Sequence, residues 1–166
     1  MRIFNFSAGP AVLPRPVLEE AQRDLVELPG VGMSVMEISH RSKTFDGILE
    51  TAIANMRSLA GIPGNYKVLF MQGGASQQFS MVPMNLFTPG ATADYVVTGE
   101  WSKKALKEAK KVGATRVAAT TEEGKFTRVP RQNEIHFAKD ACYAHMTSNN
   151  TIFGTQFHYV PDAGGV

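Results

Sequence analysis

The sequence predicts an α/β protein whose sheet is mostly parallel and carries helices on both faces. Short apolar runs of strand length alternate with amphipathic segments of about ten residues, which is typical of parallel βαβ units. Glycines and prolines separate these runs and mark the turns between them. The 166 residues are 43% hydrophobic and 19% charged, a composition that can form a buried core.

Two helices are expected ahead of the sheet. Pro16 suits the first turn of a helix, and apolar residues then recur at helical spacing until Pro29 and Gly30 end the segment. An apolar stripe over residues 45–59 predicts a second helix, and Gly61 marks its end.

The segment after the second helix is expected to be the first strand. Residues 66–72 (YKVLFMQ) form a short, continuous apolar run, which is typical of a strand buried on both faces. Gly73 and Gly74 end this strand, and residues 75–87 have helical spacing. Pro83 should kink that helix or end its regular part, because proline lacks the N–H that a helix interior needs.

The βαβ pattern then repeats along the chain. Strands are expected at residues 93–99, 115–120 and 142–147, and a helix at 101–113 separates the first two. Strands joined in this way pair in parallel through right-handed crossovers.

The order of these elements predicts two parts in the chain. Residues 1–62 are expected to form an N-terminal helical segment, made of an arm and the first helices. Residues 63–166 are expected to form the sheet-bearing domain. That domain is expected to be incomplete, because no closing helix follows the last strand and parallel strands need cover on both faces.

Composition excludes several classes of protein. Lys and Arg total 17 and Asp and Glu total 15, so the net charge of +2 is too small for a nucleic-acid-binding surface. No apolar stretch is long enough to cross a membrane, and the N-terminus has no signal-peptide pattern. With a single Cys142 and no metal-ligand spacing among the histidines, no metal site is expected. We therefore expect a cytoplasmic protein without a nucleic-acid or membrane partner.

The most informative stretch is the junction between the first expected strand and its helix. Gly73 and Gly74 let the backbone approach a bulky anion, and the free N–H groups of the first helical turn attract negative charge. Ser76 adds a hydroxyl donor. A plain tight turn with Ser76 capping the helix is the alternative, because neither a Walker nor a Rossmann glycine pattern occurs.

Two further candidate residues follow expected strands. Trp101 comes just after the strand at 93–99, and Thr151 comes soon after the strand at 142–147. Ligands of open α/β sheets bind beyond the carboxyl ends of the strands, where an indole can stack on a flat heteroaromatic ring. The alternatives are that Trp101 caps the core and that Thr151 belongs to an ordinary turn.

A histidine–arginine pair, His40 and Arg41, lies between the two N-terminal helices. The planar guanidinium of Arg41 suits bidentate binding of a carboxylate or phosphate. A surface arginine in a loop is the alternative.

The anion-binding junction, Trp101 and Thr151 together describe a site for a phosphorylated aromatic cofactor.

Several blocks of the sequence closely resemble the phosphoserine aminotransferase family. They stand in matching order across nearly the whole chain: FNFSAGPAVLP, SVMEISHR, NYKVLFMQGGASQQF, MNLF, TADYVVTGEWSKKALKEAKK and the Asn-Asn-Thr that ends at Thr151. Only the N-terminal half or less of a family member is covered. The resemblance implies the large domain of the aspartate-aminotransferase fold (fold type I), a homodimer and the cofactor pyridoxal 5'-phosphate.

The resemblance also implies a reaction. The family transfers an amino group from L-glutamate to 3-phosphohydroxypyruvate, which gives 2-oxoglutarate and O-phospho-L-serine. This is a step of serine biosynthesis and, in many bacteria, is accompanied by a related step of pyridoxine biosynthesis.

Roles for individual residues follow from the same resemblance. The cofactor-binding residues it implies are Gly74, Ala75 and Ser76 around the phosphate, Trp101 stacked on the pyridine ring, and Thr151 in contact with the cofactor. Arg41, with His40 beside it, would bind a substrate carboxylate.

Two departures from the family pattern bear on activity. Some members have Gly-Arg in place of Ala75-Ser76, so the phosphate of the substrate must be held by other groups here. No lysine lies in the Gln-Lys context of the family's Schiff-base lysine, which is expected beyond residue 166, so the chain alone is expected to be inactive. Another fold-type I aminotransferase or desulfurase, or a non-catalytic phosphate-binding module, are the alternatives.

Overall fold

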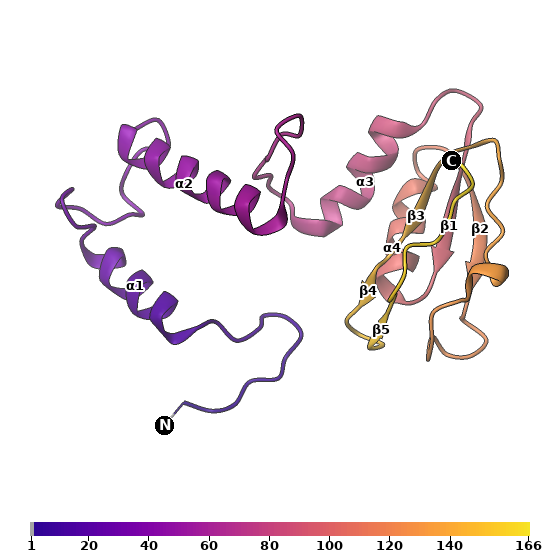
Figure 1. Cartoon of the computed structure of the whole chain (residues 1–166), viewed down its shortest axis with the longest axis horizontal. Coiled ribbons are helices and arrows are strands. Elements are labelled where there is room, and N and C mark those ends of the chain that lie inside the picture. The colour runs from indigo at the N-terminus through magenta and orange to yellow at the C-terminus, as the bar shows by residue number, and fades with distance from the viewer. Residues whose placement is uncertain (1) are drawn as a thin grey trace. The chain divides into compact units, whose positions relative to one another are not determined.

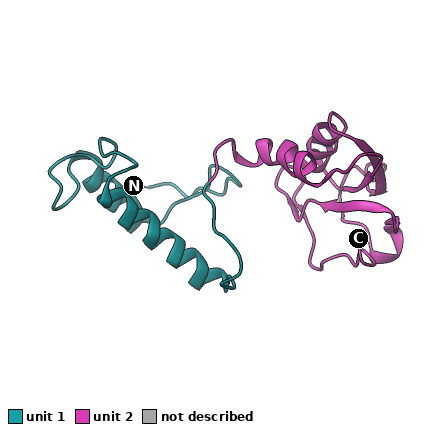
Figure 2. Cartoon of the chain, turned by 90° about the horizontal axis from the view of Figure 1, so that it is seen from above, with its two compact units in different colours: residues 1–70 teal, residues 71–166 magenta. Residues whose placement is uncertain are grey.

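The computed structural model describes residues 2–166. The chain divides into two compact units, Met1–Phe70 and Met71–Val166, coloured teal and magenta in Figure 2. None of the helices within residues 2–166 combines the length and the hydropathy that a membrane span requires.

Unit 1 contains the two helices expected from the sequence, α1 (Arg15–Val26) and α2 (Lys43–Ala60). The bounds of α2 have clear local causes. At its start, the side chain of Ser42 accepts a hydrogen bond from the N–H of Phe45, which satisfies one free donor of the first turn. At its end, Gly61 has a left-handed conformation with φ 60°, which a glycine adopts without strain.

The strand predicted at residues 66–72 is not present, and this prediction is wrong for the described residues. Leu69, Phe70 and Met71 are 73%, 60% and 52% exposed. A strand depends on hydrogen bonds to a neighbouring strand, and none of residues 2–166 pairs with this segment. Its start is held by Arg57 instead, whose guanidinium donates to the carbonyl of Tyr66 at 2.6 Å.

Unit 2 begins with helix α3 (Gly74–Leu86). Pro83 is buried in its last turn, and because proline has no N–H to donate, the helix lacks the hydrogen bond to the carbonyl four residues earlier. The helix ends soon after, at Leu86, which agrees with the expectation that the proline ends its regular part. The N–H of Phe87 closes the helix by donating to the carbonyl of Pro83 at 3.0 Å.

The sheet of unit 2 has three strands in the order β2-β1-β3 (Figure 1). Their pairing is parallel, as predicted. They are β1 (Thr92–Val97), β2 (Ala114–Thr120) and β3 (Ala141–Met146). Helix α4 (Glu100–Ala109) connects β1 to β2, and a 3-10 turn (Gln132–Glu134) precedes β3. A small antiparallel hairpin, β4 (Asn149–Asn150) with β5 (Thr155–Gln156), follows.

The two faces of the sheet are covered differently. On one face, Tyr95 and Val97 pack with residues of α4, and Phe79 and Val82 of α3 lie against the same cluster. On the other face, Val96 packs with Ile135 and Phe157, which belong to connecting segments. Within residues 2–166, α-helices therefore contribute to one core cluster, and irregular segments supply the cover on the second face.

A buried carboxylate ties the central strand to its neighbours. Asp94 of β1 is 0% exposed. Its Oδ1 accepts from the Nε of Arg116 on β2 at 2.7 Å, and its Oδ2 accepts from the backbone N–H of Ala138, ahead of β3, at 2.7 Å. Asp94 therefore helps to hold the order of the sheet.

We expect Asp94→Ala to lower the free energy of unfolding by about 3 kcal/mol, because it leaves the Ala138 N–H and the Arg116 guanidinium without their buried acceptor. Urea denaturation followed by circular dichroism measures the change. Asp140→Ala is the matched control, since Asp140 faces the same arginine at 3.8 Å but is 84% exposed. Equal effects of the two substitutions would show that Asp94 has no special role.

A second titratable group, His145 of β3, is partly buried on the same sheet. Its ring stacks on Tyr95 with the centroids 4.9 Å apart and meets the edge of Phe79. Burial lowers the pKa of His145 from its ordinary 6.5 to about 4. The unfolded chain therefore binds a proton that the folded chain excludes between these two pH values.

The free energy of unfolding is accordingly expected to fall as the pH drops from about 7 to about 4, by about 3 kcal/mol from this histidine. His145→Phe should remove that part of the pH dependence while it keeps an aromatic ring in place. Urea denaturation of both proteins across this range tests the idea. An unchanged slope in the variant would mean that His145 titrates normally.

Candidate cofactor-binding site

The first turn of α3 presents backbone N–H groups that no group of residues 2–166 accepts from. The first backbone hydrogen bond of the helix runs from the N–H of Gln77 to the carbonyl of Gly73 at 3.2 Å. No side chain caps the helix, so Ser76 does not play the capping role of the alternative interpretation. Within residues 2–166 the amides of Gly74, Ala75 and Ser76 therefore stay free to bind an anion.

Backbone conformation explains the glycines at this turn. Gly73 has φ 88° and Gly74 has φ 55°, both in the left-handed region that L side chains rarely adopt. A Cβ at Gly73 would also lie 1.7 Å from Oε1 of Gln77, whose side chain lies over the turn. The glycine pair thus allows the backbone conformation with which α3 begins.

The other two cofactor candidates are hydrogen-bonded to each other. The indole Nε1–H of Trp101, in the first turn of α4, donates to Oγ1 of Thr151 at 2.9 Å, although 50 residues separate them. Because Thr151 acts as acceptor here, its own hydroxyl proton is available for another partner. Of the three features expected at one location, the Gly73–Gln77 turn, Trp101 and Thr151, this hydrogen bond brings the last two together.

One face of the Trp101 ring is covered by a cation. The ammonium of Lys104, one turn further along α4, lies 4.5 Å from the ring centroid. Such a contact is electrostatically favourable because the ring face is negative. The indole edge is thus fixed by Thr151 and one face by Lys104, while the second face is not involved in either contact.

The two substrate-binding candidates belong to unit 1. His40 and Arg41 lie in the turn before α2, and both are exposed. The backbone N–H of Arg41 donates to Oγ of Ser39 at 3.2 Å, and within residues 2–166 no carboxylate pairs with its guanidinium. The guanidinium of Arg41 is therefore available to bind an acidic ligand.

A set of buried polar residues next to Trp101 and Thr151 was missed by the sequence analysis. Ser102, in the first turn of α4, bonds back to the residues before the helix: its Oγ accepts from the N–H groups of Thr98 and Gly99 at 2.8 and 3.0 Å. Asn150 is 0% exposed and donates to Oγ1 of Thr98 at 2.9 Å. The pairing of Asn150 with Thr98 had no local signal in the sequence.

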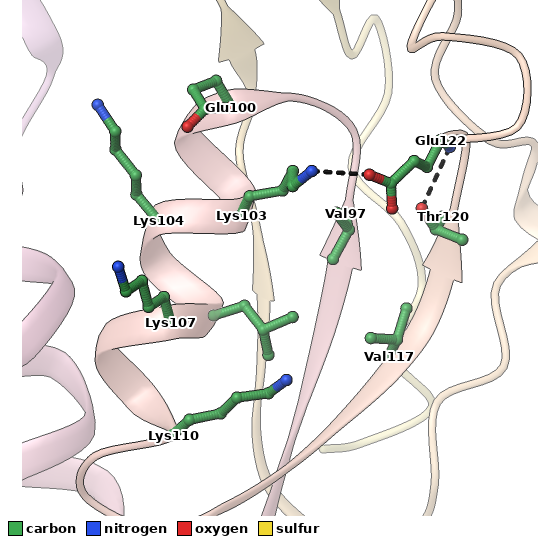
Figure 3. A pocket seen from close by; sticks show the side chains of 10 residues that line it. Val97, Glu100, Lys103, Lys104, Lys107, Lys110, Val117, Thr120 and Glu122 are labelled. Carbon is green, nitrogen blue, oxygen red and sulfur yellow. Dashed lines mark hydrogen bonds and ion pairs between the residues drawn. The ribbon is translucent and has the colours of Figure 1, made fainter.

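A groove of about 490 Å³ runs between α4 and β2, and it is separate from these residues (Figure 3). Val97, Leu106 and Val117 form its apolar part, and Lys103 pairs with Glu122 across it at 2.7 Å. Four lysines of α4 line it: Lys103, Lys104, Lys107 and Lys110. Neither Trp101 nor Thr151 lines the groove, so it is not the candidate cofactor site.

Comparison with known proteins identifies the class to which this fold and these residues belong. The chain belongs to the class-V aminotransferase family, whose sequence model matches residues 3–165.

Among individual relatives, the similarity is to phosphoserine aminotransferases. The chain is 52% identical over 161 residues to that of Geobacillus kaustophilus and 55% identical over 164 residues to that of Laribacter hongkongensis. These matches cover 97% and 99% of this chain but 45% and 46% of the relatives. The chain spans about half the length of the curated relatives it matches, and it corresponds to their N-terminal portion.

Solved structures agree with this similarity. Phosphoserine aminotransferase from Bacillus circulans subsp. alkalophilus superposes with a TM-score of 0.93 at 50% identity, over 99% of this chain and 46% of that one. The pyridoxal-phosphate-bound enzyme from Trichomonas vaginalis gives 0.89 at 38% identity, over 97% of this chain and 48% of that one. The resemblance stated from the sequence and the fold-type I architecture are thereby confirmed.

We expect Thr151→Val to change the fluorescence of Trp101, the only tryptophan, because valine keeps the shape of threonine but cannot accept from the indole N–H. The emission maximum and its quenching by acrylamide report the altered surroundings of the ring. Thr115→Val, a hydroxyl removal on β2, serves as the control. Identical emission of wild type and Thr151→Val would refute the hydrogen bond between the two side chains.

Proposed function

We propose that this chain supplies the cofactor-holding part of a phosphoserine aminotransferase. Such an enzyme transfers the amino group of L-glutamate to 3-phosphohydroxypyruvate and yields O-phospho-L-serine and 2-oxoglutarate, in serine biosynthesis. The observation that carries the proposal is the hydrogen bond between Trp101 and Thr151, because it joins the two residues that the family resemblance assigns to the cofactor. A helix N-terminus with free amides lies in the same unit.

The residues present fit pyridoxal 5'-phosphate. The free amides of Gly74, Ala75 and Ser76 at the start of α3 suit a phosphate group, since a helix N-terminus carries a partial positive charge. The Trp101 face opposite Lys104 suits a flat ring, and the Thr151 hydroxyl suits a polar substituent of that ring. When bound, the cofactor supplies the carbon that receives the amino group and a ring that stabilises negative charge.

Arg41 is proposed to bind a carboxylate of the substrate, with His40 beside it. Its guanidinium has no acidic partner in the described part of the chain, and a bidentate pair with a carboxylate is both strong and directional. Since Ser76 stands where some relatives have arginine, the substrate's phosphate is proposed to be held by groups outside the α3 turn.

Three further properties belong to the proposal. Assembly as a homodimer, location in the cytoplasm and a role in pyridoxine biosynthesis are typical of the family. The division into an N-terminal helical segment at residues 1–62 and a cofactor-binding domain at 63–166 is also proposed.

A chimera tests the proposed function. Residues 1–166 are joined to the C-terminal remainder of the Geobacillus kaustophilus relative, the part in which the family resemblance places the Schiff-base lysine. We expect the chimera to form 2-oxoglutarate from L-glutamate and 3-phosphohydroxypyruvate, and the 166-residue chain alone to show no turnover. Arg41→Ala should lower kcat/KM of the chimera about tenfold or more, and Arg128→Ala, which removes an exposed ion pair, should not.

Each other outcome points to one of the alternatives. A folded chimera that binds the cofactor but transaminates only other substrates indicates another fold-type I enzyme. A folded chimera that fails to bind pyridoxal phosphate indicates a non-catalytic module and contradicts the proposal.

A further inference from the structure

A buried polar cluster, here called the Thr98 network, contains the chain neighbours of Trp101 and Thr151. Its members come from three elements that are distant in sequence, namely the end of β1, the start of α4 and the β4–β5 hairpin: Thr98, Gly99, Ser102, Asn150 and Thr155. Thr98, Ser102 and Asn150 are 0% exposed, Gly99 is buried, and Thr155 is 6% exposed.

Both strands of the hairpin are hydrogen-bonded to Thr98, the residue that directly follows β1. Nδ2 of Asn150, on β4, donates to Oγ1 of Thr98 at 2.9 Å. Oγ1 of Thr155, on β5, donates to the carbonyl of Thr98 at 3.2 Å. The turn between them, which contains Thr151, is therefore anchored at both ends to the carboxyl end of β1.

The same network sets the start of α4. Oγ of Ser102 accepts from the N–H groups of Thr98 and Gly99 and donates to the carbonyl of Gly99 at 2.7 Å. Trp101 is the residue immediately before Ser102, just as Thr151 immediately follows Asn150. Each partner of the indole hydrogen bond is thus adjacent in the chain to a side chain held by the network.

The fit between Asn150 and Gly99 is close. A Cβ at Gly99 would lie 2.5 Å from Oδ1 of Asn150, so the amide occupies the space that a larger residue would need. That Oδ1 accepts no hydrogen bond within residues 2–166, and an unpartnered buried oxygen costs stability. An apolar side chain would avoid this cost, which favours a positional role for the amide over a purely stabilising one.

We propose that Asn150 is a positioning residue for the cofactor site: its hydrogen bond to Thr98 places Thr151 where it accepts from Trp101 and so fixes the plane of the stacking ring. The part concerning the cofactor rests on the proposed function. The part concerning the indole does not, because it is defined by the protein alone.

The single substitutions that carry the test leave Asn150, Thr151 and Trp101 in place. Thr98→Val keeps the shape of the side chain but removes the oxygen that Asn150 donates to, whereas Thr98→Ser keeps that oxygen. Gly99→Ala displaces the Asn150 amide from the opposite side. Two quantities are measured on the 166-residue chain: acrylamide quenching of Trp101 without ligand, and the affinity for pyridoxal phosphate from quenching of the same fluorescence.

We expect Thr98→Val and Gly99→Ala to make Trp101 more accessible to acrylamide, as Thr151→Val does, and to weaken pyridoxal-phosphate binding about five- to tenfold. Thr98→Ser should behave like the wild type. The double variant Thr98→Val/Thr151→Val should be no worse than Thr151→Val, because both changes break one chain of contacts.

Other outcomes separate the two levels of the proposal. If Thr98→Val only lowers the urea midpoint and leaves the fluorescence and affinity unchanged, Asn150 is merely structural and the inference is overturned. If the wild type fails to bind pyridoxal phosphate while the acrylamide results follow expectation, the proposed function fails and the positioning of Trp101 stands.

Discussion

The hydrogen bonds of Thr98 join the start of α4 and the β4–β5 hairpin to the carboxyl end of β1. Its side-chain oxygen accepts from Asn150, its carbonyl accepts from Thr155, and its N–H donates to Ser102. A parallel sheet brings strand ends to one edge but does not by itself orient the loops that follow. Here one fully buried threonine joins a helix start and a hairpin to the central strand. The segments that follow the strands are therefore held in fixed positions relative to the sheet.

That rigidity depends in turn on how β1 is held in the sheet. β1 pairs with β2 on one side and with β3 on the other. Asp94 fastens both sides through Arg116 and the Ala138 N–H, and the buried hydroxyls of Tyr95 and Tyr143 meet at 2.6 Å. Asp94 and the two tyrosines are each buried with a partner, which is the condition under which a polar side chain in a core does not destabilise the fold. The central strand is therefore a fixed base for the site.

Local signals predicted a large part of this structure, and long-range contacts account for what they missed. The Gly61 end of α2, the helix after Trp101 and the parallel pairing of the three strands all follow from spacing and from residues that end helices. The meeting of Trp101 and Thr151 followed from the rule that strand ends share an edge. Residues 66–72 failed as a strand because apolar composition describes a preference for burial, whereas pairing depends on a partner strand elsewhere. Asn150 was overlooked because its acceptor lies 52 residues away.

The charges around Trp101 give the indole two unlike faces. Lys104 lies over one of them at 4.5 Å, and its ammonium polarises the ring while keeping that face from stacking. Thr151 holds the edge, so the ring cannot turn to exchange its faces without losing the hydrogen bond. The opposite face is therefore the one proposed to stack on the cofactor ring. The uncapped first turn of α3 offers an anion a site that needs no cationic side chain, because its amides and helix dipole act together. This is a physical reason why a turn that carries Ser76 and no cationic side chain suits the phosphate of the proposed cofactor.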